Sequence, residues 1–306
     1  MQSLKYWFLA ARPKTLSAAV APVVVATALC WRDGAVRWSV AVWCALFAAL
    51  MQIAANFIND LIDFQRGTDG EERLGPERAC AQGWISPAAM RRGIVLCLLL
   101  AAAAGMAMLY ASNVWVEVDA ECSFTVHWER VIALFAVGLA CIVFAFLYTT
   151  LLSYCGLGDL LVWLFFGFVP VLGTYYVQTA TLTPEAWLLG AAVGLVTDTL
   201  LVLNNYRDRD TDRRSGKRTL VALLGARFGS GFYLVQGIAG YLCAAALACY
   251  GSPWCALLPI IYIGMHMKTW RDMVHINHGR ALNRILGKTA RNILVFGLLV
   301  ALSLLL

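Results

Sequence analysis

The stretch NFINDLID, residues 56–63, stands where a long apolar run meets a basic loop. A second stretch, NNYRDRDTD at residues 204–212, follows another apolar run and precedes another basic loop. Acidic side chains at the end of a membrane helix need a reason, because an Asp at the bilayer centre costs about 2.5–3.5 kcal/mol on insertion scales. Two such stretches in one chain predict a site for divalent cations and a polyphosphate.

The composition places the rest of the chain in a membrane. Of its 306 residues 61% are hydrophobic and 14% charged, and the mean hydropathy is +0.71, which is too apolar for a soluble domain. Apolar runs of about 17 residues or more recur along the chain without the alternation of a β-barrel. We therefore predict an all-α integral membrane protein with one domain, 1–306, and about nine spans. The predicted spans are 15–31, 36–57, 90–111, 131–152, 157–179, 186–204, 231–250, 254–267 and 292–306.

The basic residues give the orientation. With nine spans, all of the 24 Lys and Arg residues except Arg32, Arg37 and Arg130 fall on one side. Lys and Arg are retained on the cytoplasmic side of a membrane. We therefore predict a multi-pass protein of the cell inner membrane, with a cytoplasmic amino terminus and with both acidic stretches on cytoplasmic loops after the second and sixth spans.

Helical geometry groups the polar side chains of each stretch. At about 100° per residue, Asn56, Asp60 and Asp63 fall within about 60° of arc. The triplet Asn204, Asp208 and Asp212 occupies a stripe about 80° wide. Hard oxygen ligands of this kind suit Mg²⁺, which takes phosphate oxygens as further ligands, and no His or Cys joins them to indicate zinc.

Solvated helix ends are the alternative interpretation, because terminal Asp residues often cap helices. Two carboxylates about 5–6 Å apart, however, repel by roughly 3 kcal/mol at an effective dielectric near 20. Repeating that arrangement twice at membrane depth favours a bound cation, provided that the two stretches meet in space. Arg66, Lys217 and Arg218 lie within a turn or two of the carboxylates, and Mg²⁺ with Arg and Lys is a common clamp for a diphosphate. For Arg91, Arg92, Arg213 and Arg214 we favour the interpretation that membrane orientation alone explains them.

These motifs resemble the UbiA superfamily of intramembrane aromatic prenyltransferases, and most closely its branch that prenylates 1,4-dihydroxy-2-naphthoate in menaquinone synthesis. The resemblance covers nearly the whole chain. It is carried by RPKTL (12–16), NFINDLID with GTD (67–69), GLGD (156–159), and NNYRD through residue 212 to GKRTL (216–220).

The resemblance implies nine helices around a central cavity, capped on the cytoplasmic side by the acidic loops. It also implies two Mg²⁺ ions that bridge a diphosphate, with Asp60, Asp63, Asp208 and Asp212 as catalytic residues. The metal ligands carried over by position are Asn56, Asp60, Asp63, Asn204, Asp208 and Asp212. The candidates for binding the diphosphate oxygens are Lys14, Arg66, Tyr148, Lys217 and Arg218.

The implied reaction transfers a polyprenyl group from an allylic polyprenyl diphosphate to 1,4-dihydroxy-2-naphthoate, with decarboxylation to demethylmenaquinol. The implied partners are these two substrates and the lipid bilayer, without nucleic acid. The sequence departs from the family at Gly67, where many relatives have a third Asp that Asp69 could replace. After Tyr148 it lacks both the basic pair of the 4-hydroxybenzoate enzymes and the Pro expected of the naphthoate branch, so 4-hydroxybenzoate stays an alternative acceptor.

Two further features of the apolar runs call for an interpretation. The intramembrane Asp198 either accepts a proton or pairs with a polar neighbour, and we favour the pairing. We expect Gly173, Gly190 and Gly194 to permit close helix packing.

Functions from other classes predict different patterns. An ion-coupled transporter would place acids near the middle of the membrane, often with an inverted repeat, whereas the acids here cluster at one face. An alcohol phosphatidyltransferase would need a DG…AR…G…D…D motif, which the sequence lacks.

Overall fold

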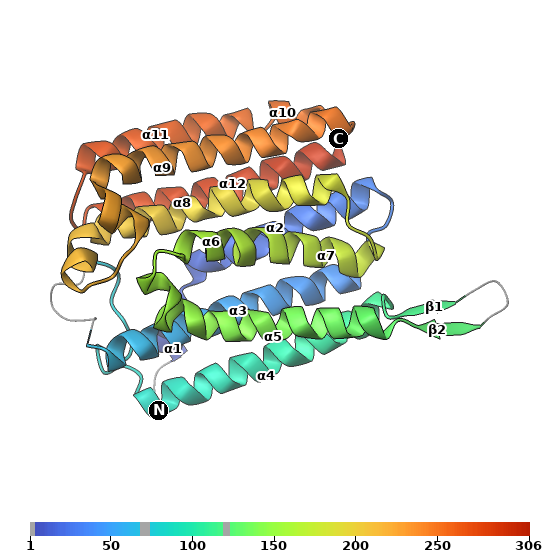
Figure 1. The fold of residues 1–306 in the computed structure, drawn as a ribbon, viewed down its shortest axis with the longest axis horizontal. Coiled ribbons are helices and arrows are strands. Elements are labelled where there is room, and N and C mark those ends of the chain that lie inside the picture. The colour runs from blue at the N-terminus through green and yellow to red at the C-terminus, as the bar shows by residue number, and fades with distance from the viewer. Residues whose placement is uncertain (1–3, 68–73, 119–122) are drawn as a thin grey trace.

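The computed structural model describes residues 4–67, 74–118 and 123–306, apart from the side chains of Lys14 and Ser153. Long helices run side by side along the longest axis of the molecule, and a short β-hairpin projects from one end (Figure 1). The α-helices are α1 (Leu4–Ala11), α2 (Pro13–Arg32), α3 (Trp38–Gln65), α4 (Pro87–Ser112), α5 (Trp128–Thr150), α6 (Gly158–Trp163), α7 (Val169–Thr179), α8 (Pro184–Arg214), α9 (Leu220–Ala245), α10 (Trp254–Leu257), α11 (Ile260–Ile276) and α12 (Leu282–Leu305). The 3₁₀ segments are η1 (Leu152–Tyr154) and η3 (Ala246–Tyr250), and η2 (Leu164–Phe168) is a π-helical turn.

The prediction of an all-α membrane protein is confirmed, with two differences. Within the described residues, eight helical segments are long and apolar enough to cross a membrane. The predicted span 254–267 is divided into α10 and the 17-residue α11, because Pro259 has no backbone N–H with which to continue a helix. The second difference is the hairpin, in which β1 (Val116–Val118) pairs antiparallel with β2 (Phe124–Val126).

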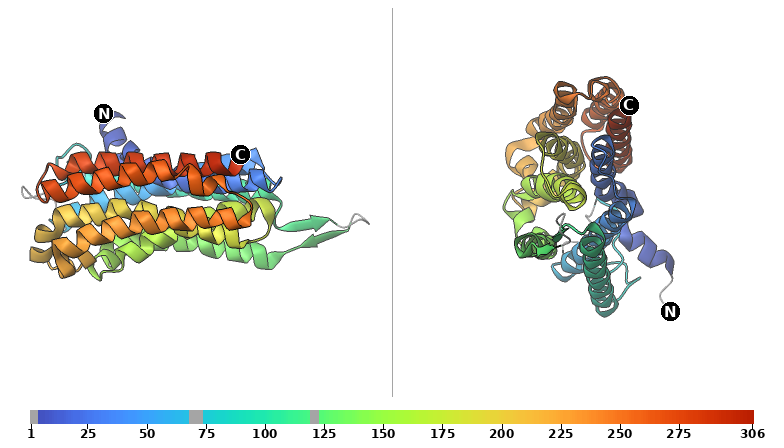
Figure 2. Two further views of the ribbon diagram at one scale, coloured as in Figure 1. Left: turned by 90° about the horizontal axis from the view of Figure 1, so that it is seen from above. Right: turned by 90° about the vertical axis from the view of Figure 1, so that its right-hand side faces the viewer.

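The outer surface of the bundle is apolar. Along α5, Thr149 is the one fully buried residue, while Ile132, Phe135 and Leu139 are exposed. An apolar surface of this extent is unstable in water and matches lipid chains. The interior is organised around α2, which packs against α3, α7, α8 and α12. Seen end-on, the blue α2 lies between the red and orange helices on one side and the green helices on the other (Figure 2).

The acidic stretches lie in the last turns of helices, and the prediction of loops was wrong here. Helix α3 continues to Gln65 and α8 to Arg214, beyond the predicted ends at 57 and 204. An apolar run indicates how much of a helix lies in the membrane, but it does not indicate the residue at which the helix ends. Both helices end just before a glycine with positive φ, Gly67 and Gly216, which is a common way for a helix to stop. The two helix ends lie at the same end of the bundle, opposite the hairpin (Figure 1).

Small residues bring the segment from α6 to α7 close to α8. A Cβ atom on Gly167 would lie 2.5 Å from the carbonyl oxygen of Gly190 and 2.6 Å from Cα of Gly194. The expected close packing is therefore confirmed for Gly190 and Gly194. It is wrong for Gly173, around which a Cβ would meet open space, and Gly167 takes that role instead.

Candidate functional site

The side chains of the first acidic stretch divide between two directions. Asp60 is 1% exposed, and its two carboxylate oxygens accept hydrogen bonds from the backbone N–H groups of Ala79 and Cys80, both at 2.9 Å. Asn56 donates to the carbonyl oxygen of Ala11 at 2.9 Å and to the Thr15 hydroxyl at 3.0 Å. Asp60 thus fixes the loop that returns from α3, and Asn56 fixes the amino-terminal segment.

Of the remaining side chains of this helix end, Asn59 and Arg66 contact α5, and Asp63 contacts the loop after α3. Asp63 is paired with Arg78 at 2.8 Å, and Asn59 accepts a hydrogen bond from the Thr149 hydroxyl. Arg66 donates to the carbonyl oxygens of Thr149 at 3.1 Å and of Thr150 at 2.6 Å. The carboxylate that is open to further ligands on this helix is therefore Asp63, whose side chain is 23% exposed.

The second acidic stretch presents its carboxylates along one face of α8. Leu201, Asn205, Asp208 and Asp212 are spaced by four, three and four residues, which places them on one stripe. Leu201 and Asn205 line a pocket. Asn204 lies about 100° away on the helix and donates to the carbonyl oxygen of Leu200 in its own helix.

The two carboxylates of this stripe differ in what they contact. Asp208 accepts two hydrogen bonds from the guanidinium of Arg207, at 2.7 and 2.5 Å. Asp212 is 8% exposed, and its Oδ1 lies 3.9 Å from Nζ of Lys217. Its Oδ2 is buried without a hydrogen-bond partner among the described residues. A buried carboxylate oxygen in this condition is an open ligand position.

The two acidic helix ends come together through residues from other helices. Asn283 of α12 donates to the carbonyl oxygen of Leu74, in the loop after α3, and accepts from Arg207 of α8, both at 2.8 Å. One amide side chain therefore joins the two acidic segments.

The connection between α5 and α6 provides a second link. The guanidinium of Arg66 lies 4.9 Å from the centre of the Tyr154 ring, and the Tyr154 carbonyl accepts from the backbone N–H of Arg218 at 3.2 Å. Gly156 allows this approach, because it has a φ of +77° and a Cβ there would lie 2.9 Å from the Arg218 carbonyl oxygen.

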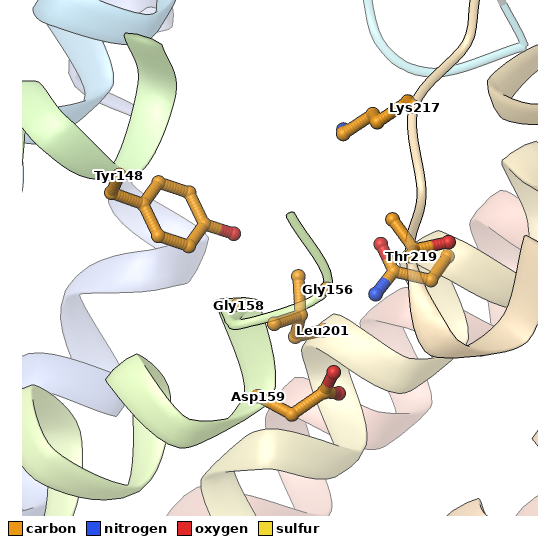
Figure 3. Close-up of a pocket in the computed structure, with 8 residues that line it drawn as sticks. Tyr148, Gly156, Gly158, Asp159, Leu201, Lys217 and Thr219 are labelled. Atoms are coloured by element: carbon orange, nitrogen blue, oxygen red, sulfur yellow. The ribbon is translucent and has the colours of Figure 1, made fainter. Parts of the chain in front are cut away.

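A pocket lies at the meeting point of these segments (Figure 3). The hydroxyl of Tyr148, the ammonium of Lys217 and the carboxylate of Asp159 approach it from three sides. The enclosed part has room for about one water molecule. Its lining consists of Tyr148, Gly156, Gly158, Asp159, Leu201, Asn205, Lys217 and Thr219.

The structure therefore brings together part of the predicted site. Asp63, Asp208, Asp212, Tyr148 and Lys217 are gathered at this end of the bundle, with Arg66 and the backbone of Arg218 beside them. Their roles toward metal and diphosphate stay predictions. The residues that are held by other contacts are Asn56, Asp60 and Asn204. Those outside the described part of the chain are Asp69 and the side chain of Lys14.

Three site residues were missed, and each had a signal in the sequence. Asn205 is next to the chosen Asn204, Asp159 is in the GLGD segment, and Arg78 is a basic residue shortly after the first stretch. The interpretation of Asp198 as a paired acid agrees with its contacts, since its Oδ2 accepts from Trp163 Nε1 at 3.2 Å and Gln236 Nε2 at 2.7 Å.

Asp60→Asn and Asp63→Asn form a matched pair that separates anchoring from ligand binding. Asp60→Asn replaces one carboxylate oxygen by an NH₂ group, which cannot accept the hydrogen bond from the backbone N–H of Ala79 or Cys80. That N–H group loses its partner, and a buried polar group without a partner costs about 1–3 kcal/mol. Asp63→Asn removes the charge of a carboxylate that is 23% exposed, but it keeps a side-chain oxygen that can still accept the hydrogen bond from the buried Arg78. We expect the Asp60 variant to unfold at a clearly lower temperature in detergent than the Asp63 variant. Equal unfolding temperatures would contradict the anchoring role of Asp60.

Comparison with known proteins agrees with this arrangement. The model of the UbiA prenyltransferase family matches residues 19–292. The chain is 34% identical over 255 residues to 1,4-dihydroxy-2-naphthoate octaprenyltransferase of Haemophilus influenzae, covering 81% of this chain and 78% of that protein. It is 33% identical over 306 residues to the protein of the same name from Mycobacterium tuberculosis, covering 98% and 97%.

Solved structures share the fold. A UbiA homolog from Aeropyrum pernix K1 superposes with a TM-score of 0.61 at 15% identity, over 94% of this chain and 96% of that one. A UbiA homolog from Archaeoglobus fulgidus, bound to DMAPP and Mg²⁺, gives a TM-score of 0.59 at 13% identity, over 96% and 98%. With the match over nearly the whole sequence, the chain belongs to the UbiA prenyltransferase family.

Proposed function

We propose that this protein transfers a polyprenyl group from an allylic polyprenyl diphosphate to 1,4-dihydroxy-2-naphthoate, with loss of CO₂, to give demethylmenaquinol. The observation that carries the proposal is the common location of Asp63 on α3 and of Asp208 and Asp212 on α8, each beside a basic side chain, at one end of an apolar bundle. The names of the relatives support the acceptor, because both those from Haemophilus influenzae and Mycobacterium tuberculosis are 1,4-dihydroxy-2-naphthoate octaprenyltransferases.

The donor set fits Mg²⁺. The available ligands are carboxylate oxygens, and Asp212 Oδ2 is a buried oxygen with no partner among the described residues. No three acidic, His or Cys side chains gather around one point in the part of the chain that the structure describes. Substrate phosphate oxygens and water would therefore complete the coordination, which is usual for Mg²⁺. Asp63, Asp208 and Asp212 would hold the ions, which would neutralise charge on the departing diphosphate.

The basic side chains of the site change partners when substrate binds. Each of the three carboxylates has a cation beside it, namely Arg78, Arg207 and Lys217. With the carboxylates engaged by ions, these cations become available to phosphate oxygens. Lys217, Arg218, Arg66 and Tyr148, with Lys14, are the proposed diphosphate ligands, and they stabilise the leaving group as the bond to carbon breaks.

The membrane-embedded helices hold the prenyl group and keep water away from its reacting carbon. An allylic carbon that develops positive charge is quenched by water, so the reacting carbon must be kept dry. The apolar helices provide that environment, and the tail extends along them toward lipid. We also propose that the acidic end of the bundle and the amino terminus face the cytoplasm at the inner membrane, as the distribution of Lys and Arg favours.

Purified protein given a defined polyprenyl diphosphate and 1,4-dihydroxy-2-naphthoate is expected to form prenylated product and to release CO₂ in equal amount. EDTA should stop the reaction and added Mg²⁺ should restore it, because the carboxylates cannot hold the diphosphate without a cation. Product analysis by mass spectrometry and trapping of labelled CO₂ provide the measurement.

The acceptor is tested by replacing the naphthoate with 4-hydroxybenzoate in the same assay. Prenylation of 4-hydroxybenzoate alone, without CO₂, would reject the proposed acceptor and keep the reaction class. An absence of any prenylated product from a folded, Mg²⁺-supplied protein would reject both.

A further inference from the structure

The proposed reaction needs a group that the acidic helix ends do not provide. An aromatic ring becomes a strong carbon nucleophile when one of its hydroxyl groups gives up a proton, and a positioned base accelerates such a step by about 10²–10⁴-fold. Asp63 and Asp208 are each paired with an Arg, and with Asp212 they are the proposed ligands of the metal. The base must therefore be another side chain near the diphosphate.

Asp159 has an unused oxygen at that place. It lies in the first turn of α6, its exposed fraction is 4%, and its Oδ1 is buried without a hydrogen-bond partner among the described residues. Leaving a buried polar atom without a partner costs about 1–3 kcal/mol, so such an atom calls for a ligand or a water molecule.

The pocket limits what can reach this oxygen. Its enclosed part has room for about one water molecule, which is about the size of a single hydroxyl group. Asp159 shares the pocket with Lys217 and Tyr148, two of the proposed diphosphate ligands (Figure 3). A hydroxyl group in the pocket would thus hold its ring next to the carbon that the diphosphate leaves.

Asp198 is less suited to the role and instead supports Asp159. The Oδ2 of Asp198 accepts from Trp163 and Gln236, and its Oδ1, like that of Asp159, has no hydrogen-bond partner among the described residues. Unlike Asp159, however, Asp198 is completely buried and does not line the pocket. Trp163 is one helical turn after Asp159 on α6, so its bond to Asp198 fixes α6 against α8 and sets the position of Asp159.

We propose that Asp159 accepts the hydrogen bond, and then the proton, of a hydroxyl group on the aromatic acceptor. The proton moves from the hydroxyl oxygen to Asp159, and the ring carbon that bears the carboxylate forms a bond to the first prenyl carbon. The bond from that prenyl carbon to the diphosphate oxygen breaks with its electron pair. When the carboxylate leaves as CO₂ and the ring regains its aromaticity, Asp159 returns the proton. No net proton is consumed. This inference rests on the proposed function.

The first test combines a variant with altered acceptors. Asp159→Asn keeps the shape of the side chain and removes its ability to take a proton. It is compared with the wild type on 1,4-dihydroxy-2-naphthoate and on the two analogues that each lack one hydroxyl group. We expect a loss in kcat of about 10²-fold with the full acceptor and with one analogue. With the analogue that lacks the contacted hydroxyl, the variant should equal the wild type, because the two changes remove the same interaction.

The second test is chemical rescue. Removing the side chain in Asp159→Ala leaves space for a small acid, and added formate should raise its kcat at least several-fold. The matched control is Asp208→Ala. Formate should not rescue this variant, because it lacks a proposed metal ligand and still has the proposed base. Thermal unfolding and binding of the polyprenyl diphosphate should be close to wild type in Asp159→Asn.

The outcomes separate this inference from the proposed function. If the wild type is active and Asp159→Asn has the same kcat, the proposed role of Asp159 is overturned and the proposed function is kept. Equal losses with all three acceptors and no rescue by formate also overturn it, because they indicate a structural role. If the wild type uses only another aromatic acid, the proposed acceptor fails, and the same variants with hydroxyl-deleted forms of that acid decide the role of Asp159.

Discussion

Asp212→Asn is expected to lower kcat/KM by about 10³-fold, near the upper end of what the loss of one electrostatic group at a reacting centre costs. The substitution keeps the size of the side chain and replaces a charged oxygen that has no hydrogen-bond partner among the described residues. The concentration of Mg²⁺ needed for half-maximal activity should rise at the same time, because one ligand of the ion is weakened.

Asp212→Asn should lower the activity of the protein without lowering its thermal stability. Removing a buried, incompletely paired charge relieves a desolvation cost, so the unfolding temperature should be equal to or above that of the wild type. Asp272→Asn is the matched control, since Asp272 is paired with Lys288 at 2.6 Å outside the site. It should keep wild-type kcat/KM. Near-normal turnover by a purified Asp212→Asn protein would falsify the assignment of the second acidic stretch.

Gly167→Ala is expected to destabilise the fold by about 3 kcal/mol or more. The added methyl group would lie 2.5 Å from the Gly190 carbonyl oxygen and 2.6 Å from Gly194 Cα, and backbone atoms cannot turn aside as a side chain can. Overpacking usually costs about 1–3 kcal/mol, and contact with backbone atoms of two residues of α8 places this variant at the upper limit. The yield of folded protein and its unfolding temperature in detergent are the measurements.

Gly173→Ala is the control for the same exchange in α7. A Cβ at this position meets nothing within 4 Å, and Ala favours a helix interior over Gly by about 1 kcal/mol. This variant should be as stable as the wild type or more so. If both alanine variants behave alike, the contact between η2 and α8 is not the tight one described above.

The sequence predicted the membrane-spanning segments well because burial in lipid demands long apolar runs. It did not predict where the helices end, because hydropathy reports the edge of the membrane and the backbone of α3 and α8 continues beyond it. Gly67 and Gly216 were the available signals for those ends. The division at Pro259 was likewise a local signal that the apolar run obscured.

The sequence predicted which residue types form the site better than it predicted which of those side chains point into it. Helical geometry states which residues share a face, but not what that face contacts. Asn56 and Asp60 therefore looked equivalent to Asp63, although the loop at Ala79 and Cys80 folds back onto Asp60. For the same reason, the prediction chose Asn204, which lies about 100° around α8 from Asn205, the amide that lines the pocket. Asp159 comes to the site by packing of α6 on α8, which no spacing in the sequence encodes.

The amide of Asn283 has a consequence for biosynthesis. It lies 209 residues downstream of Leu74, whose carbonyl oxygen it binds, so the ribosome completes the first acidic stretch long before it makes the side chain that fastens the following loop. The loop after α3 can therefore be fastened to α12 only after nearly the whole chain has been synthesised.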